Sequence, residues 1–309
     1  MEIQGTLFRS AGPGSVGKVR IGTSGYQYPD WVGPWYPSGM SSRNMLSYYC
    51  QHFDTVELNS SYYGMPRRST AQRLTTETPD GFLTVVKAYK GMTHKFEGWD
   101  IYDQFREALE PLMTSGKLGG ILFQFPPWFQ NDVRRRRYLK RLPDLLPGVP
   151  IIVEFRDRQW IKPATFALLE DAGIAYCCVD EPDLPELVPP VAHVTSPLGY
   201  LRFHSRDAGG WYGGGETRYD YDYGDAELEE WVEKILTLMQ SVKQFIVYFN
   251  NCKRSSAAHN AERFRQILEQ RLPGASGARP AELHEVTVGP GPGEVAEDPL
   301  RFSADDDQT

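Results

Sequence analysis

The sequence predicts a single-domain (β/α)8 TIM-type barrel, with a parallel sheet inside and helices outside. Eight short apolar segments are spread along the chain, helix-like segments follow most of them, and each ends in a polar, often ionisable, residue. Alternating strand and helix patterns indicate a parallel α/β fold. The length of 309 residues suits one such barrel with extensions, because a barrel typically takes about 250 residues.

Each element can be placed along this pattern. The expected strands cover residues 19–23, 55–59, 82–87, 120–124, 151–156, 174–180, 200–204 and 245–250. Apolar spacing of three and four residues predicts the helices between them. These run from Ser41 or Ser42 to Phe53, near 69–77, over 102–113, through the basic run 134–141, between Pro163 and Gly173, over 225–242 and up to about Leu272. Pro111 is expected to kink or shorten its helix, Asp225 to cap another, and the proline-rich connection 181–197 to carry little helix.

The two ends of the chain differ from the middle in composition. Residues 1–18 are rich in glycine and serine and predict a loose leader before a barrel domain at 19–272. Residues 273–309 hold eight acidic and two basic residues without periodicity, which predicts a disordered acidic tail. The remainder holds 32 acidic and 31 basic residues, so the charge of −7 is mostly the tail's and says little about partners of the barrel.

The composition also bears on the compartment. The four cysteines show no disulfide spacing and are expected to be reduced thiols. No signal peptide is evident, and no run of about 18 apolar residues predicts a membrane span. We therefore expect a cytoplasmic protein with no membrane partner.

Several strands end in polar pairs. Residues two apart in a strand share a face, which applies to Glu57 with Asn59, Glu154 with Arg156, and Arg202 with His204. In a parallel barrel the C-terminal strand ends converge on the face that carries essentially all characterised active sites. The functional site is expected on this face.

A set of short motifs occurs in order from about residue 19 to residue 272. They are Ile21-Gly22-Thr23-Ser24-Gly25-Tyr26 with Trp31 and Tyr36-Pro37, Thr55-Val56-Glu57-Leu58-Asn59 with Tyr62-Tyr63, Lys87 with Thr93-His94, Leu122-Phe123-Gln124-Phe125-Pro126-Pro127, Val153-Glu154-Phe155-Arg156 with Trp160, Arg202-Phe203-His204, and Tyr248-Phe249-Asn250-Asn251 with Asn260-Ala261. In these stretches the chain resembles a known family, the domain of unknown function 72 or YecE-like proteins. The resemblance implies a TIM-type barrel and no established activity. A likeness of such proteins to endonuclease IV-type barrels is an analogy between folds.

The predicted catalytic residues are Glu154, His204, Asp180 and Lys87. Two charges on one face of a buried strand are costly unless they are paired or functional. A carboxylate can act as general acid or base, and a histidine titrates near neutrality. Arginines can grip a carboxylate or phosphate, so a ligand site is predicted at Arg156, Arg202, Glu57, Asn59, Gln124, Tyr26, His94, Asn250 and Asn251.

Structural alternatives remain open for these residues. Glu154 and Arg156 can form a buried ion pair, and Lys87 and Arg202 can neutralise the other acids. A mixed set of histidines and carboxylates could bind a metal, but no HExxH spacing appears and no metal ligand is predicted. Residues 250–256 can bind an anion at a helix N-terminus or simply cap that helix.

Two further segments carry weaker signals. Gly209 to Gly215 flank Trp211 and Tyr212 and suggest a mobile flap. The basic run 134–141 is expected to be a solvated helix face rather than a nucleic-acid contact.

Three functions fit the sequence. The first is an enzyme that acts by acid–base chemistry on a small anionic or phosphorylated ligand. The alternatives are a nucleic-acid-binding protein or metal-dependent phosphodiesterase, and a non-catalytic ligand sensor. The sequence identifies no cofactor, substrate or oligomeric state.

Overall fold

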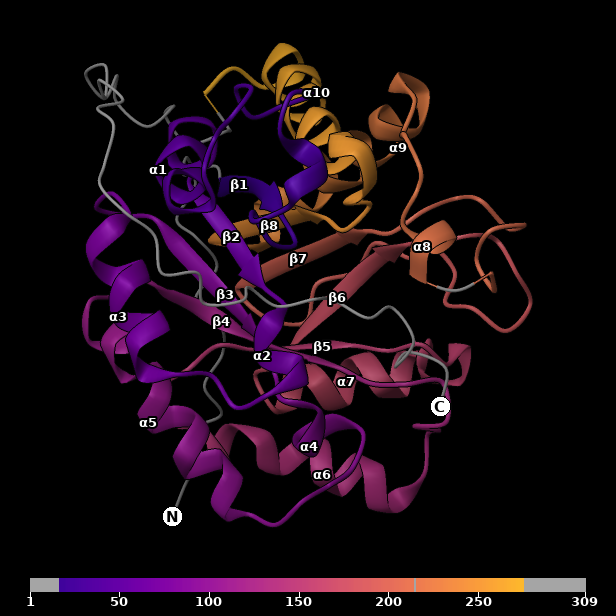
Figure 1. Ribbon diagram of the computed structural model, residues 1–309. Helices are drawn as coiled ribbons and strands as arrows, with labels where there is room; N and C mark the ends of the chain where they lie inside the picture. The colour runs from indigo at the N-terminus through magenta and orange to yellow at the C-terminus, as the bar shows by residue number, and fades with distance from the viewer. Residues whose placement is uncertain (1–16, 214, 275–309) are drawn as a thin grey trace.

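The fold is known from a computed structural model that describes residues 17–213 and 215–274. Eight parallel strands form one sheet in the order β1-β8-β7-β6-β5-β4-β3-β2 (Figure 1). They are β1 (Lys18–Thr23), β2 (Thr55–Leu58), β3 (Leu83–Lys87), β4 (Leu118–Gln124), β5 (Ile151–Glu154), β6 (Ala175–Asp180), β7 (Leu198–Phe203) and β8 (Gln244–Phe249). Between β1 and β2 the sheet closes through one bridge, Ser24 to Glu57. The predicted (β/α)8 barrel is confirmed.

Helices surround the sheet, with α5, α6 and α7 on one side and α1, α9 and α10 on the other (Figure 1). They are α1 (Ser42–His52), α2 (Ser60–Tyr63), α3 (Arg68–Glu77), α4 (Lys90–Thr93), α5 (Asp100–Thr114), α6 (Val133–Leu145), α7 (Pro163–Asp171), α8 (Gly215–Arg218), α9 (Asp225–Leu238) and α10 (Ser256–Arg271). The connection 181–197 between β6 and β7 contains no helix, as its composition predicts. The leader and the acidic tail lie almost wholly outside the described residues.

Two local predictions are corrected by the structure. The helix that contains Pro111 does not end there but continues to Thr114, because its buried face, which includes Phe105 and Leu112, packs on the barrel. Asp225 is the first residue of α9 and not its cap. The cap is Gly224, whose backbone N–H donates to the Glu227 carboxylate at 2.9 Å.

The junction of β1 and β2 depends on a tyrosine from α1. The Tyr49 hydroxyl accepts a hydrogen bond from Thr23 N at 2.9 Å and donates to Thr55 O at 3.0 Å, so it replaces a backbone hydrogen bond between the strands. Gly22 permits the close approach, since a Cβ at this position would lie 2.2 Å from Thr55 O. The barrel is therefore closed by one bridge and one side-chain hydroxyl.

The core fills the barrel interior and the space between sheet and helices. All eight strands are almost entirely buried, and Trp31, Trp160 and Trp231 are fully buried under the surrounding segments. Within residues 17–213 and 215–274, no helix is long and apolar enough to cross a bilayer.

Candidate functional site

The innermost part of the site is an arginine between two carboxylates. Arg202, near the end of β7, donates from Nη1 to Glu154 Oε2 at 2.7 Å and from Nη2 to Glu57 Oε1 at 2.8 Å. All three side chains are at most 1% exposed. Ser24 and Tyr200 add hydroxyl donors to Glu57, each at 2.7 Å. Arg202 and Glu57 are thus paired with each other inside the barrel, which favours the structural alternative for both over contact with a ligand.

A second arginine joins this group to the end of β6. Arg156 Nη2 lies 2.7 Å from Glu154 Oε1, and its Nη1 donates to Glu181 Oε2 at 2.8 Å. The other oxygen of Glu181 accepts from Val188 N at 2.8 Å. The five side chains Glu57, Arg202, Glu154, Arg156 and Glu181 form a continuous chain of alternating charge, here called the mouth network.

The pKa values of the two carboxylates that share Arg156 are shifted in opposite directions. Burial raises the pKa of Glu154, but Arg156 and Arg202 outweigh it and hold this pKa well below its usual range. Burial raises the pKa of Glu181 to about 7, and Arg156 only partly opposes the shift while the charge of Glu154 adds to it. Carboxyl pairs whose pKa values are driven apart are typical of acid–base sites.

His204 lies against this network. Its Nε2 is 3.2 Å from Glu154 Oε1, and its Nδ1 is 3.1 Å from Asn250 Nδ2. Burial lowers the pKa of His204 to about 3, and the charge of Arg156, whose Nη2 is 3.1 Å from Nε2, adds to the effect. The ring is therefore neutral. When Nδ1 accepts from Asn250, Nε2–H donates to Glu154, and the Arg156 guanidinium, which can only donate, lies beside this bond without a hydrogen bond to the ring.

The aromatic residue over this end of the network comes from the glycine-rich segment after β7. The Trp211 ring centroid lies 5.7 Å from the Arg156 guanidinium and 6.4 Å from the centroid of the His204 ring. Arg218 lies over the same ring at 5.0 Å and donates from Nε to Trp211 O at 2.9 Å. Trp211 is only 3% exposed, so it packs over the mouth of the barrel.

Comparison with known proteins gives the chain a family. The model of the family described as "Protein of unknown function DUF72" matches residues 20–283. The chain belongs to the DUF72 family. A curated relative, the UPF0759 protein YunF of Bacillus subtilis (strain 168), is 34% identical over 284 residues, which cover 86% of this chain and 99% of YunF.

Two solved DUF72 structures have the same fold. The Thermotoga maritima protein is 34% identical, with a TM-score of 0.76 over 82% of this chain and 99% of that one. A protein of Enterococcus faecalis V583 is 28% identical, with a TM-score of 0.73 over 81% of this chain and 95% of that one. The predicted family resemblance is confirmed. These descriptions name no reaction, so a function for this DUF72 chain has to be argued from its site.

Two of the residues predicted for the site point away from it. The Asp180 side chain lies on the outer face of the barrel, where Arg206 Nη2 and the Tyr223 hydroxyl each bind it at 2.8 Å. The Asn251 side chain donates to Tyr221 O at 2.8 Å and braces the loop before α10. The prediction that Asp180 joins Glu154 at one mouth is wrong, because alternate residues of a strand face opposite sides. Asn251 is likewise turned away from the mouth.

Two other predicted residues, Gln124 and Lys87, lie on the same inner face of the sheet as Glu154 and Glu57. Gln124 pairs in register with Glu154, and Lys87 lies two residues beyond Val85, the register partner of Glu57. The ammonium group of Lys87 lies 4.4 Å from the centre of the Tyr62 ring. His94 lies near the same ring, with centroids 5.1 Å apart.

Tyr26 and Asn59 line a separate cavity of about 510 Å³ beyond the ends of β1 and β2. Arg73 of α3 also lines it and donates from Nη2 to the Tyr26 hydroxyl at 2.8 Å. Asn59 Oδ1 is buried there and has no hydrogen-bond partner among the described residues. The two residues therefore belong to this side cavity and not to the mouth network.

The surroundings of the acids at the mouth and of the loop before α10 bear on the proposed metal and anion sites. Among the described residues, no group of three or more His, Cys, Asp or Glu side chains is placed to hold a metal ion. The acids at the mouth are instead paired with arginines. In the loop before α10, Asp30 accepts from Arg254 N at 2.9 Å and the Arg254 side chain pairs with Asp220, so protein carboxylates already approach this loop.

Glu181 is the residue that sequence analysis missed. It follows Asp180 at the start of a proline-rich connection, for which the sequence predicts no site residue. A signal was present, because two consecutive acids at a strand end must point to opposite faces, so one of them faces the barrel.

Proposed function

We propose that the chain is an enzyme that catalyses proton transfer on a small ligand carrying an anionic group, at the C-terminal mouth of the barrel. The observation that supports this most strongly is the pair Glu154 and Glu181 on one buried arginine, with pKa values driven in opposite directions. A general acid or base works best when its pKa lies near the working pH. Glu181 fits this role, in place of the sequence-based assignment of proton transfer to Glu154.

Each remaining residue of the mouth has a distinct part in the proposal. Glu154 stays ionised and fixes the tautomer of His204, as a carboxylate does for a catalytic histidine. Arg156 binds the anionic group of the ligand. When Glu181 takes up a proton, Arg156 keeps a single carboxylate partner, Glu154, and has capacity for another anion. Lys87, on the same sheet face, adds positive charge.

The test is a search for turnover in a mixture of small metabolites. Wild-type protein is incubated with a bacterial metabolite extract, and mass spectrometry follows compounds that disappear or form with time. Glu181→Gln should lose at least about a hundredfold of any such rate, since general acid–base catalysis typically contributes about 10²–10⁴-fold. Glu229→Gln, an exposed change on α9, is the matched control. No change with wild type, or equal rates with Glu181→Gln, would contradict the proposal.

A further inference from the structure

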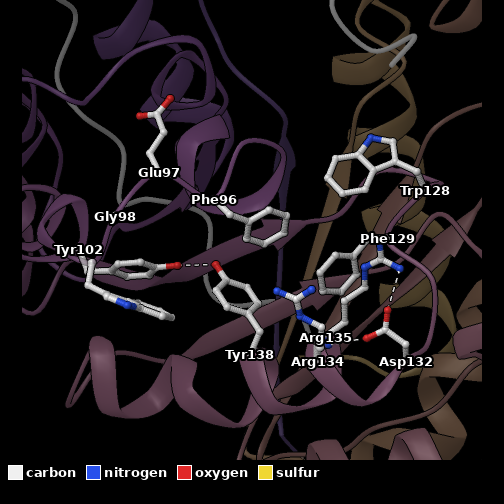
Figure 2. A pocket seen from close by; sticks show the side chains of 11 residues that line it. Phe96, Glu97, Gly98, Tyr102, Trp128, Phe129, Asp132, Arg134, Arg135 and Tyr138 are labelled. Atoms are coloured by element: carbon white, nitrogen blue, oxygen red, sulfur yellow. Dashed lines mark hydrogen bonds and ion pairs between the residues drawn. The ribbon is translucent and has the colours of Figure 1, made fainter.

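A second cavity lies outside the barrel, between the loops after β3 and β4 and helices α5 and α6 (Figure 2). Its volume is about 490 Å³, which falls within the usual size of small-molecule sites. The side chains that matter for its chemistry are Phe96, Trp99, Trp128, Tyr138, Arg134 and Arg135. None of the mouth-network residues lines it, so it is a separate feature of the molecule.

The cavity collects exposed aromatic rings. Six large hydrophobic side chains are exposed among the described residues, and three of them, Phe96 (41%), Trp99 (51%) and Trp128 (37%), line this cavity. A fourth, Val133, begins α6 beside it. Rings that serve only packing are buried, as Phe129 is in the same wall at 1% exposure. A cluster of exposed aromatic surface at a concave site is typical of a binding site.

The rings are held in a defined arrangement. Phe96 has a φ of +52°, in the left-handed region that bulky residues rarely adopt. Its ring meets Trp128 and Tyr138 nearly edge-on, with centroids 6.1 and 5.1 Å apart. The Tyr138 hydroxyl is hydrogen-bonded to that of Tyr102 (Figure 2) and to Met92 O. A strained residue that keeps its ring in a cavity wall points to a functional constraint.

Positive charge borders the rings on the α6 side. Residues 134–141 hold six basic side chains and no acidic one. The Arg135 guanidinium lies 5.9 Å from the Trp128 ring, and that of Arg141 lies 4.4 Å from the Trp99 ring. The wall also contains two acids, Asp132 and Glu97. The Asp132 carboxylate accepts a hydrogen bond from Arg135 N at 2.8 Å and forms an ion pair with the Arg135 guanidinium at 3.2 Å. The wall thus combines flat apolar faces with two guanidinium groups and two carboxylates, and the remaining cations of α6 add positive charge beside it.

We propose that this cavity binds a free nucleotide. The base would stack on the exposed ring of Trp128 or Trp99, since planar rings stack on aromatic side chains whatever their substituents. The phosphate would be bound by Arg134 and its basic neighbours on α6, because guanidinium groups match phosphate geometry. A purely apolar ligand would not use the arginines, and a simple anion would not use the rings.

Isothermal titration calorimetry with three probes tests whether the cavity recognises both the base and the phosphate of a nucleotide. Adenosine 5′-monophosphate should bind measurably, whereas adenosine and ribose 5-phosphate, which each lack one half of the recognition, should bind at least about tenfold more weakly. Trp128→Ala should weaken the nucleotide by about 5- to 100-fold, the range for loss of one stacking partner. Arg134→Ala should weaken the nucleotide and leave adenosine unchanged. Arg137→Ala, an exposed change on the same helix outside the cavity, is the matched control.

Other outcomes would overturn the proposal. Absence of heat with the nucleotide at millimolar concentration would do so, as would equal loss with Arg137→Ala and Arg134→Ala. A single-stranded oligonucleotide that binds far more tightly than its free nucleotide, in a length-dependent way, would assign the surface to nucleic acid instead. Circular dichroism of each variant establishes that the fold is retained.

Discussion

Replacing Arg202 tests the energetic role of the mouth network. Arg202→Met keeps an apolar chain of similar length and removes both ion pairs, to Glu154 at 2.7 Å and to Glu57 at 2.8 Å. Glu154 keeps Arg156, but Glu57 keeps only the hydroxyls of Ser24 and Tyr200. Leaving a buried charge without its partner costs about 3–5 kcal/mol. At about 2–4 °C per kcal/mol for a domain of this size, the melting temperature should fall by about 6–20 °C.

The same reasoning predicts a compensating change. Glu57→Gln removes the charge that Arg202→Met leaves unpaired. The melting temperature of the double variant should therefore fall by less than the sum of the falls in the two single variants. Differential scanning calorimetry of the four proteins measures this coupling. Arg263→Met, which breaks an exposed pair with Asp225, is the control and should leave the melting temperature nearly unchanged. An Arg202→Met protein as stable as the control, or a double variant with strictly additive losses, would show that these buried ion pairs do not stabilise the fold.

Three further predictions follow from separate parts of the structure. Tyr49→Phe leaves Thr23 N and Thr55 O unpaired at the β1–β2 junction, and the free energy of unfolding in urea should fall by about 1–3 kcal/mol; an unchanged midpoint would show that the hydroxyl does not close the barrel. All four thiols are free and buried, and burial raises the pKa of Cys177 well above its usual range, so the native protein should react with a thiol reagent only after unfolding; fast reaction of any cysteine would contradict this. Burial raises the folded-state pKa of Glu181 to about 7 from 4.5, so the stability contributed by its proton is lost as the pH rises through this window. The melting temperature of Glu181→Gln should therefore rise relative to that of wild type between about pH 5 and pH 8. A difference in melting temperature that stays constant with pH would argue against the shift.

Much of the barrel follows from the sequence because its elements alternate regularly. The paired strand ends Glu154-Phe155-Arg156 and Arg202-Phe203-His204 bring their charges together as the two-residue period requires, and all four side chains meet. This part of the site depends only on strand geometry. It could therefore be predicted without knowledge of the loops.

The failure at Asp180 has an equally physical cause. Strands of a parallel barrel are buried on both faces, so their apolar residues do not show which side is inside. In β6, adjacent Cys177 and Cys178 give no hint of the inner face, and it is Cys177 whose thiol approaches Glu154, at 3.9 Å. The apolar pattern of β6 therefore does not show whether Asp180 faces the inside or the outside of the barrel.

Loop conformation limited the remaining predictions. Tyr26 and Asn59 follow adjacent strands, yet the segments after β1 and β2 turn them into a side cavity with Arg73 of α3. Helix α6 was expected to carry a solvated basic face, and most of its cations are exposed. Its position beside the exposed rings of Trp99 and Trp128 depends on two loops whose course the sequence does not specify.

The proton on Glu181 is the central element of this account, and a carboxyl-carbon NMR titration measures it directly. In protein labelled at the glutamate side-chain carboxyl, one resonance should titrate near pH 7, as burial of Glu181 requires, and should be missing from Glu181→Gln. Glu154, held ionised by two arginines, should show no titration at neutral pH. A Glu181 resonance that titrates at the ordinary value for glutamate would contradict the proposed acid–base role.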